Sequence, residues 1–392
     1  MRKPRALALL LLILAACSNH AASSVPDSGL DANTTDALGP FDPQVDAADV
    51  SILYPLDPFA KGELVNADET AAYGQLLPEN IVPGMPYPLD VDGGSYADLR
   101  VVGVRLDPCS ARGGCSSEVR VVYQPIVAHT VMGEAADGAV HVFYAVPADE
   151  LRYMLEQILA LKKAYGAGIA YGDKLGPQPI LAATGNSGAY AQGLHAILLA
   201  HLGEQRIERV TFLLHVFPDQ DAWQFALFER VASAFVARSI INVTSPSQEI
   251  LGNVAFPDQL GGIEQDAQST PTLPGVAVLA SASRPAQATP AVVAGFASAV
   301  DAQNPMKHTS EDTDCGSCHL AEGARRAGTQ VYGLTPTAPF TSARSLDYVR
   351  DSIAVTNFHA FGYLGTSISV MQRTANESAL VADRMQAELV AH

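Results

Sequence analysis

The sequence has few charged residues, and few basic ones in particular. Of its 392 residues, 17% are charged, and 24 Lys and Arg stand against 41 Asp and Glu, which gives a formal net charge of −17. So acidic a chain repels phosphate backbones, and we therefore expect no nucleic-acid partner. Hydrophobic residues make up 48% of the chain. That share is typical of a globular protein and excludes a largely disordered one.

Familiar catalytic motifs are also missing. The sequence contains no Gly-x-Ser-x-Gly elbow, no His-Glu-x-x-His zinc motif, no phosphate-binding glycine loop and no dinucleotide fingerprint. The absence of these patterns gives no support to the hydrolase, metalloprotease and nucleotide-binding classes that carry them. The first three quarters of the chain therefore predict a fold but no chemistry.

Long apolar runs are equally scarce. The run Leu7–Leu14 follows Arg2, Lys3 and Arg5 and is too short to span a membrane comfortably, and no other run reaches about 18 residues. The next residues, Leu14-Ala15-Ala16-Cys17, resemble the lipobox of bacterial lipoproteins. The alternative is a plain secretory signal or an uncleaved anchor.

The lipobox resemblance implies that residues 1–16 are a signal peptide and that Cys17 becomes acylated. It thus implies a lipid membrane as partner and a location in the bacterial cell envelope, either periplasm-facing or at the outer membrane. Residues 17–50 contain six Asp and no Lys or Arg, with Ser, Ala, Gly and Pro filling most of the rest. This composition predicts a disordered acidic tether.

Residues 51–303 predict an α+β or mixed α/β domain built around a sheet. Runs rich in β-branched residues indicate strands at 99–105, 119–123, 140–146 and 210–217, with a short apolar strand at 276–279. Helical spacing favours helices from about 147, around 190–198, over 223–236 and over 290–300. Residues 244–274 read as a long loop. In an oxidising envelope, Cys109 and Cys115 are expected to form a disulfide across a hairpin connection.

Two of the five cysteines stand in the sequence Cys315-Gly316-Ser317-Cys318-His319. Asp314 is expected to cap a helix that begins at Cys315 and ends at Gly328, so that both thiols share one helix face. This motif resembles the attachment site of c-type cytochromes. The resemblance implies one covalent haem c, held by thioethers at Cys315 and Cys318 and ligated by His319 as the proximal iron ligand.

Composition changes near Asn304-Pro305, where we place a boundary before a small, mostly α-helical cytochrome-c-like domain at 304–392. Three alternatives to haem remain at the motif. Cys315 and Cys318 could form a redox disulfide or a structural disulfide, or they could bind zinc together with Cys109 and Cys115.

The ligand on the other side of the iron is open. His308 is our candidate because it lies in a polar loop close to the motif, and Met371 is the alternative because it precedes a helix that starts with a capping box at Thr374. Met306 and His359 are further candidates. Arg325, Arg326 and Arg344 could pair with the haem propionates.

Three functions follow from these patterns. The first is electron transfer through one haem, with a redox protein as partner, since filled axial sites leave no room for substrate at iron. The second is a haem enzyme with an open sixth iron site, of a peroxidase-like kind. The third is a binding protein without haem, stabilised by disulfides.

Overall fold

The structure is a computed structural model in which residues 43–392 form one compact unit. It describes residues 44–56, 63–81, 94–109, 116–127, 134–216, 222–243, 245–252, 263–265, 273–281, 283–309, 312–354 and 356–391. The predicted signal peptide, Cys17, the tether up to residue 43 and Cys115 lie outside the described residues. Within the part of the chain that the structure covers, no helix is both long and apolar enough to cross a membrane.

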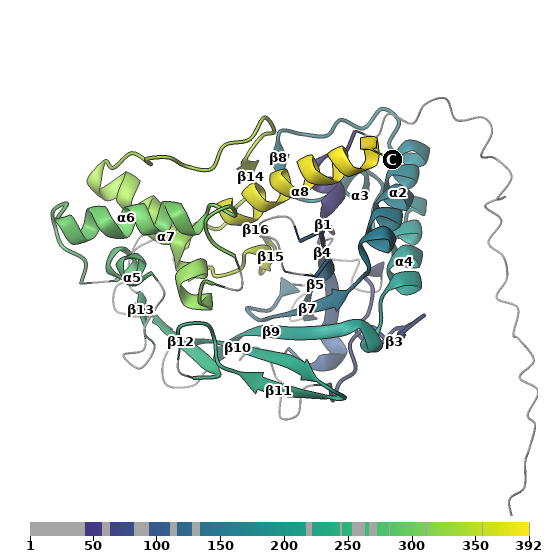
Figure 1. Ribbon diagram of the computed structural model, residues 1–392, viewed down its shortest axis with the longest axis horizontal. Helices are drawn as coiled ribbons and strands as arrows, with labels where there is room; N and C mark the ends of the chain where they lie inside the picture. The colour runs from purple at the N-terminus through teal and green to yellow at the C-terminus, as the bar shows by residue number, and fades with distance from the viewer. Residues whose placement is uncertain are drawn as a thin grey trace, which may run out of the picture. The chain divides into compact units, whose positions relative to one another are not determined.

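A large antiparallel sheet forms the centre of this unit (Figure 1). Its strand order is β1 (Ser51–Leu53), β4 (Leu99–Asp107), β5 (Glu118–Val127), β7 (Ala139–Ala145), β9 (Ile207–Val216), β10 (Ala222–Val231), β12 (Ser247–Gly252) and β13 (Ile263–Gln265). Two further strands pair at its margins, β6 (Glu134–Ala135) with β5 and β11 (Ala234–Arg238) with β10. The strands predicted at 99–105, 119–123, 140–146 and 210–217 are confirmed, and so is the mixture of sheet and helices.

Three predictions in the second half of the sheet domain are wrong. Residues 244–274, predicted as a long loop, contain strands β12 and β13. Residues 223–236 form the hairpin β10–β11 instead of a helix, because β10 pairs along its length with β9 and buries Trp223 and Phe225 at alternate positions. Conversely, the predicted strand 276–279 lies in helix α5 (Pro274–Ala280). A short apolar run does not by itself distinguish a buried strand from a buried helix.

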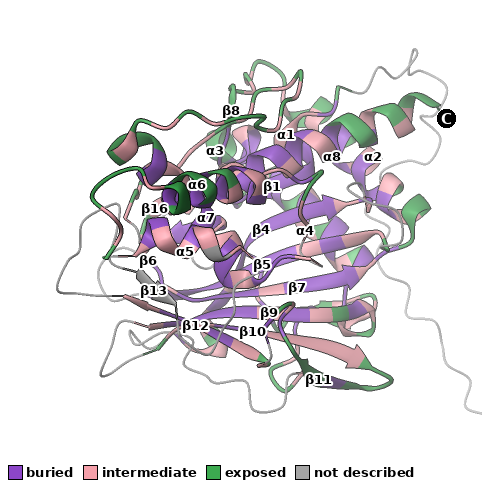
Figure 2. Cartoon of the chain, turned by 60° about the vertical axis from the view of Figure 1, so that its left-hand side comes forward, coloured by how far each residue is buried: buried purple, intermediate pink, exposed green. Residues whose placement is uncertain are grey.

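One face of the sheet is covered by α2 (Ala148–Tyr165) and α4 (Ala189–His201), which pack against each other (Figure 1). The predicted apolar face of α2, from Leu151 to Leu159, is buried, and it shares one core with Val140, Val142 and Tyr144 of β7. Figure 2 shows the buried residues running along β4, β5 and β7. Alternate residues of β7 therefore point away from these helices.

A second core lies where α5, α6 (Pro290–Ala302) and α7 (Cys315–Tyr332) pack together. The apolar residues of these helices contact those of β9, β10 and β12, among them Leu213, Phe225 and Ile250. Helix α6 begins as predicted, since the Thr289 side chain accepts a hydrogen bond from the Val292 N–H at 3.3 Å.

The predicted domain boundary near residue 304 is wrong. The hairpin β15 (Phe361–Leu364)–β16 (Ser367–Val370) and helix α8 (Gln372–Ala391) bury their apolar residues in the same core as β4 and β5. Gln124 of β5 joins the two parts, because its side chain accepts the Tyr363 N–H at 2.7 Å and donates to the Tyr363 carbonyl at 2.9 Å. The last 88 residues thus complete the sheet domain and do not fold around a core of their own.

The predicted tether is wrong at its C-terminal end. Residues Ala47–Val50 form helix α1, in which Asp49 and Val50 are buried, and Val45 just before it is buried as well. Burial raises the pKa of Asp49, while Lys162 of α2 opposes that rise from 2.6 Å away. The apolar side chains and this ion pair hold residues 45–50 in the core.

The remaining short elements are α3 (Pro179–Thr184), the 3-10 turns Tyr96–Asp98 and Glu204–Arg206, and the strands β2 (Thr70–Ala71), β3 (Gly74–Gln75), β8 (Lys174–Leu175) and β14 (Asp347–Tyr348).

Candidate functional site

Helix α7 begins at Cys315, as predicted. The buried Asp314 carboxylate accepts the Ser317 N–H at 2.9 Å and a hydrogen bond from the Gln248 amide at 2.6 Å. The Gln248 side chain in turn accepts the Gly316 N–H at 2.7 Å. Because Gln248 belongs to β12, the first turn of the motif is fixed to the sheet as well as to its own cap.

The predicted end of α7 at Gly328 is wrong. The helix continues to Tyr332, and Gly333 ends it in the left-handed conformation with φ of 66°. Gly328 serves packing instead, since a Cβ atom there would lie 2.1 Å from a ring carbon of Phe296. The glycine lets α6 and α7 approach closely.

His319 makes a hydrogen bond that selects one form of its ring. Its Nδ1 lies 2.5 Å from the carbonyl oxygen of Phe358, and since a carbonyl can only accept, Nδ1 carries the proton. The Phe225 ring lies 4.9 Å from the imidazole, between ring centres. Burial lowers the pKa of His319 to about 4. The side chain is therefore a neutral imidazole whose Nε2 retains its lone pair.

Cys315, Cys318 and His319 all line one cavity, which encloses about 1060 Å³ of empty space with its open mouth included. The space within it that is open to the centres of water-sized spheres is about 160 Å³, below the roughly 300–1,000 Å³ typical of ligand pockets. The two cysteines are free thiols and do not pair with each other. The neighbouring Gly316, Ser317 and Leu320 are buried, whereas the three motif residues are only half-buried. The two thiols and the imidazole are thus the side chains at the start of this helix that remain accessible.

Three arginines on neighbouring strands line the same cavity. The strand register pairs Arg105 with Arg120, Arg120 with Phe143, and Phe143 with Arg209, so these side chains form one row across β4, β5, β7 and β9. The guanidinium carbons of Arg120 and Arg209 lie 4.7 Å and 4.0 Å from the centre of the Phe143 ring. Arg373 of α8 adds a fourth cation to the lining. We call these four residues the arginine row.

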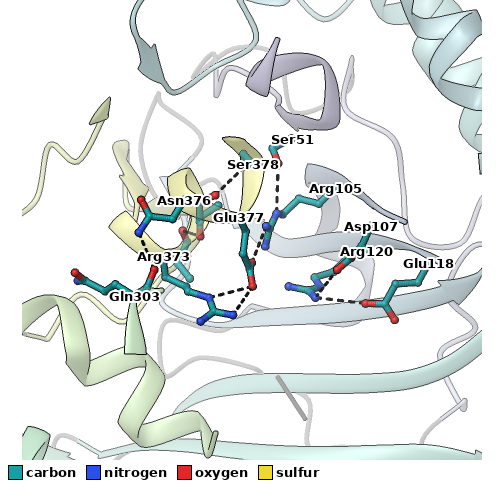
Figure 3. A network of polar contacts seen from close by, with 12 residues as sticks. Ser51, Arg105, Asp107, Glu118, Arg120, Gln303, Arg373, Asn376, Glu377 and Ser378 are labelled. Atoms are coloured by element: carbon teal, nitrogen blue, oxygen red, sulfur yellow. Dashed lines mark hydrogen bonds and ion pairs between the residues drawn. The ribbon is translucent and has the colours of Figure 1, made fainter. Parts of the chain in front are cut away.

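Two glutamates and Asp107 partly neutralise the arginine row, and Figure 3 shows their contacts with Arg105, Arg120 and Arg373. Glu377 binds Arg105 at 2.8 Å and Arg373 at 2.7 Å, and Glu118 lies 3.3 Å from Arg120. Burial opposes ionisation of Glu377, but the cations outweigh it and hold the pKa of that carboxyl far below its ordinary value. The buried Nε atoms of Arg120 and Arg209 have no hydrogen-bond partner among the described residues. Asp107 also lies 4.0 Å from Arg120, and Glu118 lies 3.4 Å from Arg209. The four arginines thus face three carboxylates, which leaves this wall of the cavity with positive charge for an anion.

His141 is a cavity residue that the sequence did not single out. It lies on β7, in register with Val122 of β5 and Thr211 of β9, and it lines the cavity together with His319. Burial lowers its pKa well below the ordinary value of histidine. The strand alternation was the available signal, because Val140 and Val142 face the helices and leave His141 on the other face.

The structure does not bring the predicted distal candidates to this cavity. His308 lies with its Nδ1 3.5 Å from Asp312, and Met371 is buried just before α8. Met306 is exposed. His359 contacts a smaller adjoining cavity, but both of its ring nitrogens are engaged, one by Asp137 at 2.8 Å and one by Gln124 at 3.4 Å.

The arginines proposed for propionates also lie elsewhere. Arg325 pairs with Glu322 at 3.0 Å, Arg344 pairs with Asp383 at 2.6 Å, and Arg326 donates to a backbone carbonyl. Cys109 is disulfide-bonded, while its predicted partner Cys115 lies outside the described residues. Over the described ranges, no three His, Cys, Asp or Glu residues gather in a way that could hold a metal ion.

No protein-family model, no curated protein and no solved structure matches this chain. The site must therefore be interpreted from its own residues.

Proposed function

We propose that this protein is an electron-transfer protein that holds one c-type haem in the cavity between α7 and the sheet. Cys315 and Cys318 are the attachment residues and His319 is the proximal iron ligand. The observation that carries the proposal is the Nδ1–H bond from His319 to the Phe358 carbonyl, made by a residue of the attachment motif that lines the same cavity as both cysteines. Histidines that bind metals usually donate their second nitrogen in this way, which orients the ring and leaves Nε2 for the metal.

The lining of the cavity fits the other parts of a haem. The guanidinium groups of Arg120 and Arg209 suit the carboxylates of its propionates, and both arginines stand on strands that pair with β7. Phe225, Phe361 and Val122 supply apolar surface for the ring. A haem bound here supplies one-electron redox chemistry at its iron, which the surrounding protein tunes through burial and charge.

The site needs the whole fold and not a separate cytochrome domain. α7 contributes the motif, the loop before β15 contributes the Phe358 carbonyl, and the strands contribute the arginine row. We infer that the small cytochrome-like domain expected from the motif is replaced here by a sheet that forms one side of the haem pocket.

The N-terminal pattern supports an envelope location for this activity. We propose that Cys17 carries the lipid and that the acidic segment after it links the membrane to the folded unit. The envelope is also where covalent haem attachment takes place in bacteria. Since the chain has a formal net charge of −17, its redox partner is expected to present a basic surface.

The test is whether the protein carries covalent haem. The full chain is expressed together with a haem-maturation system, denatured, separated by electrophoresis and stained for haem peroxidase activity. The wild-type band should stain, Cys315→Ala and Cys318→Ala should lose normal two-thioether attachment, and Cys109→Ser, a cysteine outside the cavity, should still stain. A wild-type protein without covalent haem would overturn the proposal.

A further inference from the structure

We propose that His141 is the second axial ligand of the iron, which makes the site a bis-histidine haem. The inference rests on the proposed function, because it assigns a residue to the other side of the same group. It replaces His308 and Met371, which the structure does not place in the cavity lining.

The position of His141 follows from the strand that carries it. In β7, Val140, Val142 and Tyr144 are buried in the core beneath α2 and α4, so His141 between them faces the cavity. β7 is paired on both sides, by β5 and by β9, and lies in the interior of the sheet. A ligand mounted on such a strand has little freedom to move, as tight metal ligation requires.

The imidazole of His141 is also available. The described residues supply it with no hydrogen bond, and each other histidine near it is engaged. His319 donates to Phe358, and His359 contacts Asp137 and Gln124. His141 lines the two adjoining cavities together with His319 and Cys315.

The spacing along the strand matches a ligand with a central metal and peripheral carboxylates. Phe143, the strand neighbour of both Arg120 and Arg209, follows His141 by two residues. Two residues of an antiparallel strand span about 7 Å. One wall of the cavity therefore presents an imidazole and, about 7 Å further along, the two guanidinium groups that stack on Phe143. A group that bound iron at His141 would bring its carboxylates toward the arginine row.

A second imidazole ligand would prevent other molecules from binding the iron. If His141 and His319 both held the iron, no position on it would be left open, and a small molecule would bind only by displacing an imidazole. Two imidazoles also set a lower potential than the His/Met pair that Met371 would give. The site then moves electrons and does not bind substrate at iron.

The test uses the full chain loaded with haem, and spin state is its readout. The wild type should be low-spin in the ferric form. His141→Ala should become high-spin while it retains covalent haem, and added imidazole should return it to the low-spin form. His141→Met, which keeps a ligand at the position, should stay low-spin with a higher midpoint potential. His308→Ala is the matched control and should have the wild-type spectrum.

Different failures lead to different conclusions. A wild type without covalent haem overturns the proposed function itself. A His141→Ala protein that keeps covalent haem and a low-spin spectrum overturns the assignment of His141 alone, and so does a high-spin wild type, which would favour the peroxidase-like alternative. If His141→Ala does not fold, the potential of His141→Met decides, and a potential equal to that of the wild type overturns the assignment.

Discussion

The Nδ1 atom of His319 lies 2.5 Å from the carbonyl oxygen of Phe358, 39 positions further along the chain. This contact joins the start of α7 to the loop that leads into β15. It settles which ring nitrogen of His319 carries a proton, and so which nitrogen can bind a metal. The loop around Phe358 is therefore as important to the proposed site as the motif itself.

Asn357 should prove necessary for this loop. Its side chain, 2% exposed, donates to Ser369 at 2.7 Å and accepts the His359 N–H at 3.2 Å. Asn357→Ala leaves these groups unsatisfied, and we expect the free energy of unfolding to fall by about 1–3 kcal/mol. Urea titration followed by circular dichroism measures it. Thr341→Ala, at an exposed position, is the control and should unfold like the wild type. An unchanged midpoint for Asn357→Ala would show that the loop is held by other contacts.

Because of Glu377, the free energy of unfolding should depend on pH in the acidic range. Since the pKa of Glu377 in the folded protein is held below the ordinary value of 4.5, its contribution is complete above about pH 4.5 and is lost as pH falls toward the folded pKa. Glu377→Gln should cost about 3–5 kcal/mol near neutral pH, because Arg105 and Arg373 lose their shared partner. The difference from the wild type should shrink as pH falls below 4.5.

Denaturant titrations between neutral pH and pH 3 measure this difference. Glu388→Gln removes a more exposed carboxylate that pairs with Arg384 within the same helix, and it should have little effect at any pH. A gap between Glu377→Gln and the wild type that stays constant with pH would show that Glu377 does not titrate as described.

The arginine row should influence both haem retention and potential. The double variant Arg120→Leu, Arg209→Leu removes two cations from the cavity lining. We expect less haem per protein, and a lower midpoint potential in what is loaded, because loss of positive charge favours the oxidised iron. Potentiometric titration and the haem-to-protein ratio measure the two effects. Arg238→Leu, an exposed residue paired with Glu229, should change neither.

Gly328 should tolerate no side chain. Within a helix, Gly→Ala normally gains about 1 kcal/mol from propensity. Here the new methyl group would meet the Phe296 ring, and we expect overpacking to cost about 1–3 kcal/mol instead. Thermal unfolding of Gly328→Ala measures the net effect. Adding Phe296→Leu should recover part of the loss, and a single variant that is more stable than the wild type would disprove the close contact.

The local parts of the site could be predicted from the sequence because they depend on neighbours in the chain. The start of α7 follows from Asp314, and the two thiols lie near one another because of helical spacing. The strands at 99–105 and 140–146 follow from runs of β-branched residues. Predictions failed where strand pairing outweighed the local helical pattern. Trp223, for example, lies in a strand because β10 pairs with β9.

The sequence by itself therefore determined the motif from Cys315 to His319, the helix that carries it and the expectation of a haem. Only the tertiary structure decided what faces that motif. Phe358, His141 and the arginine row lie far from Cys315 in the chain, and they meet it because the sheet and the C-terminal hairpin share one core. No local pattern encodes such contacts, because they depend on which faces of distant strands are buried and which remain toward the cavity.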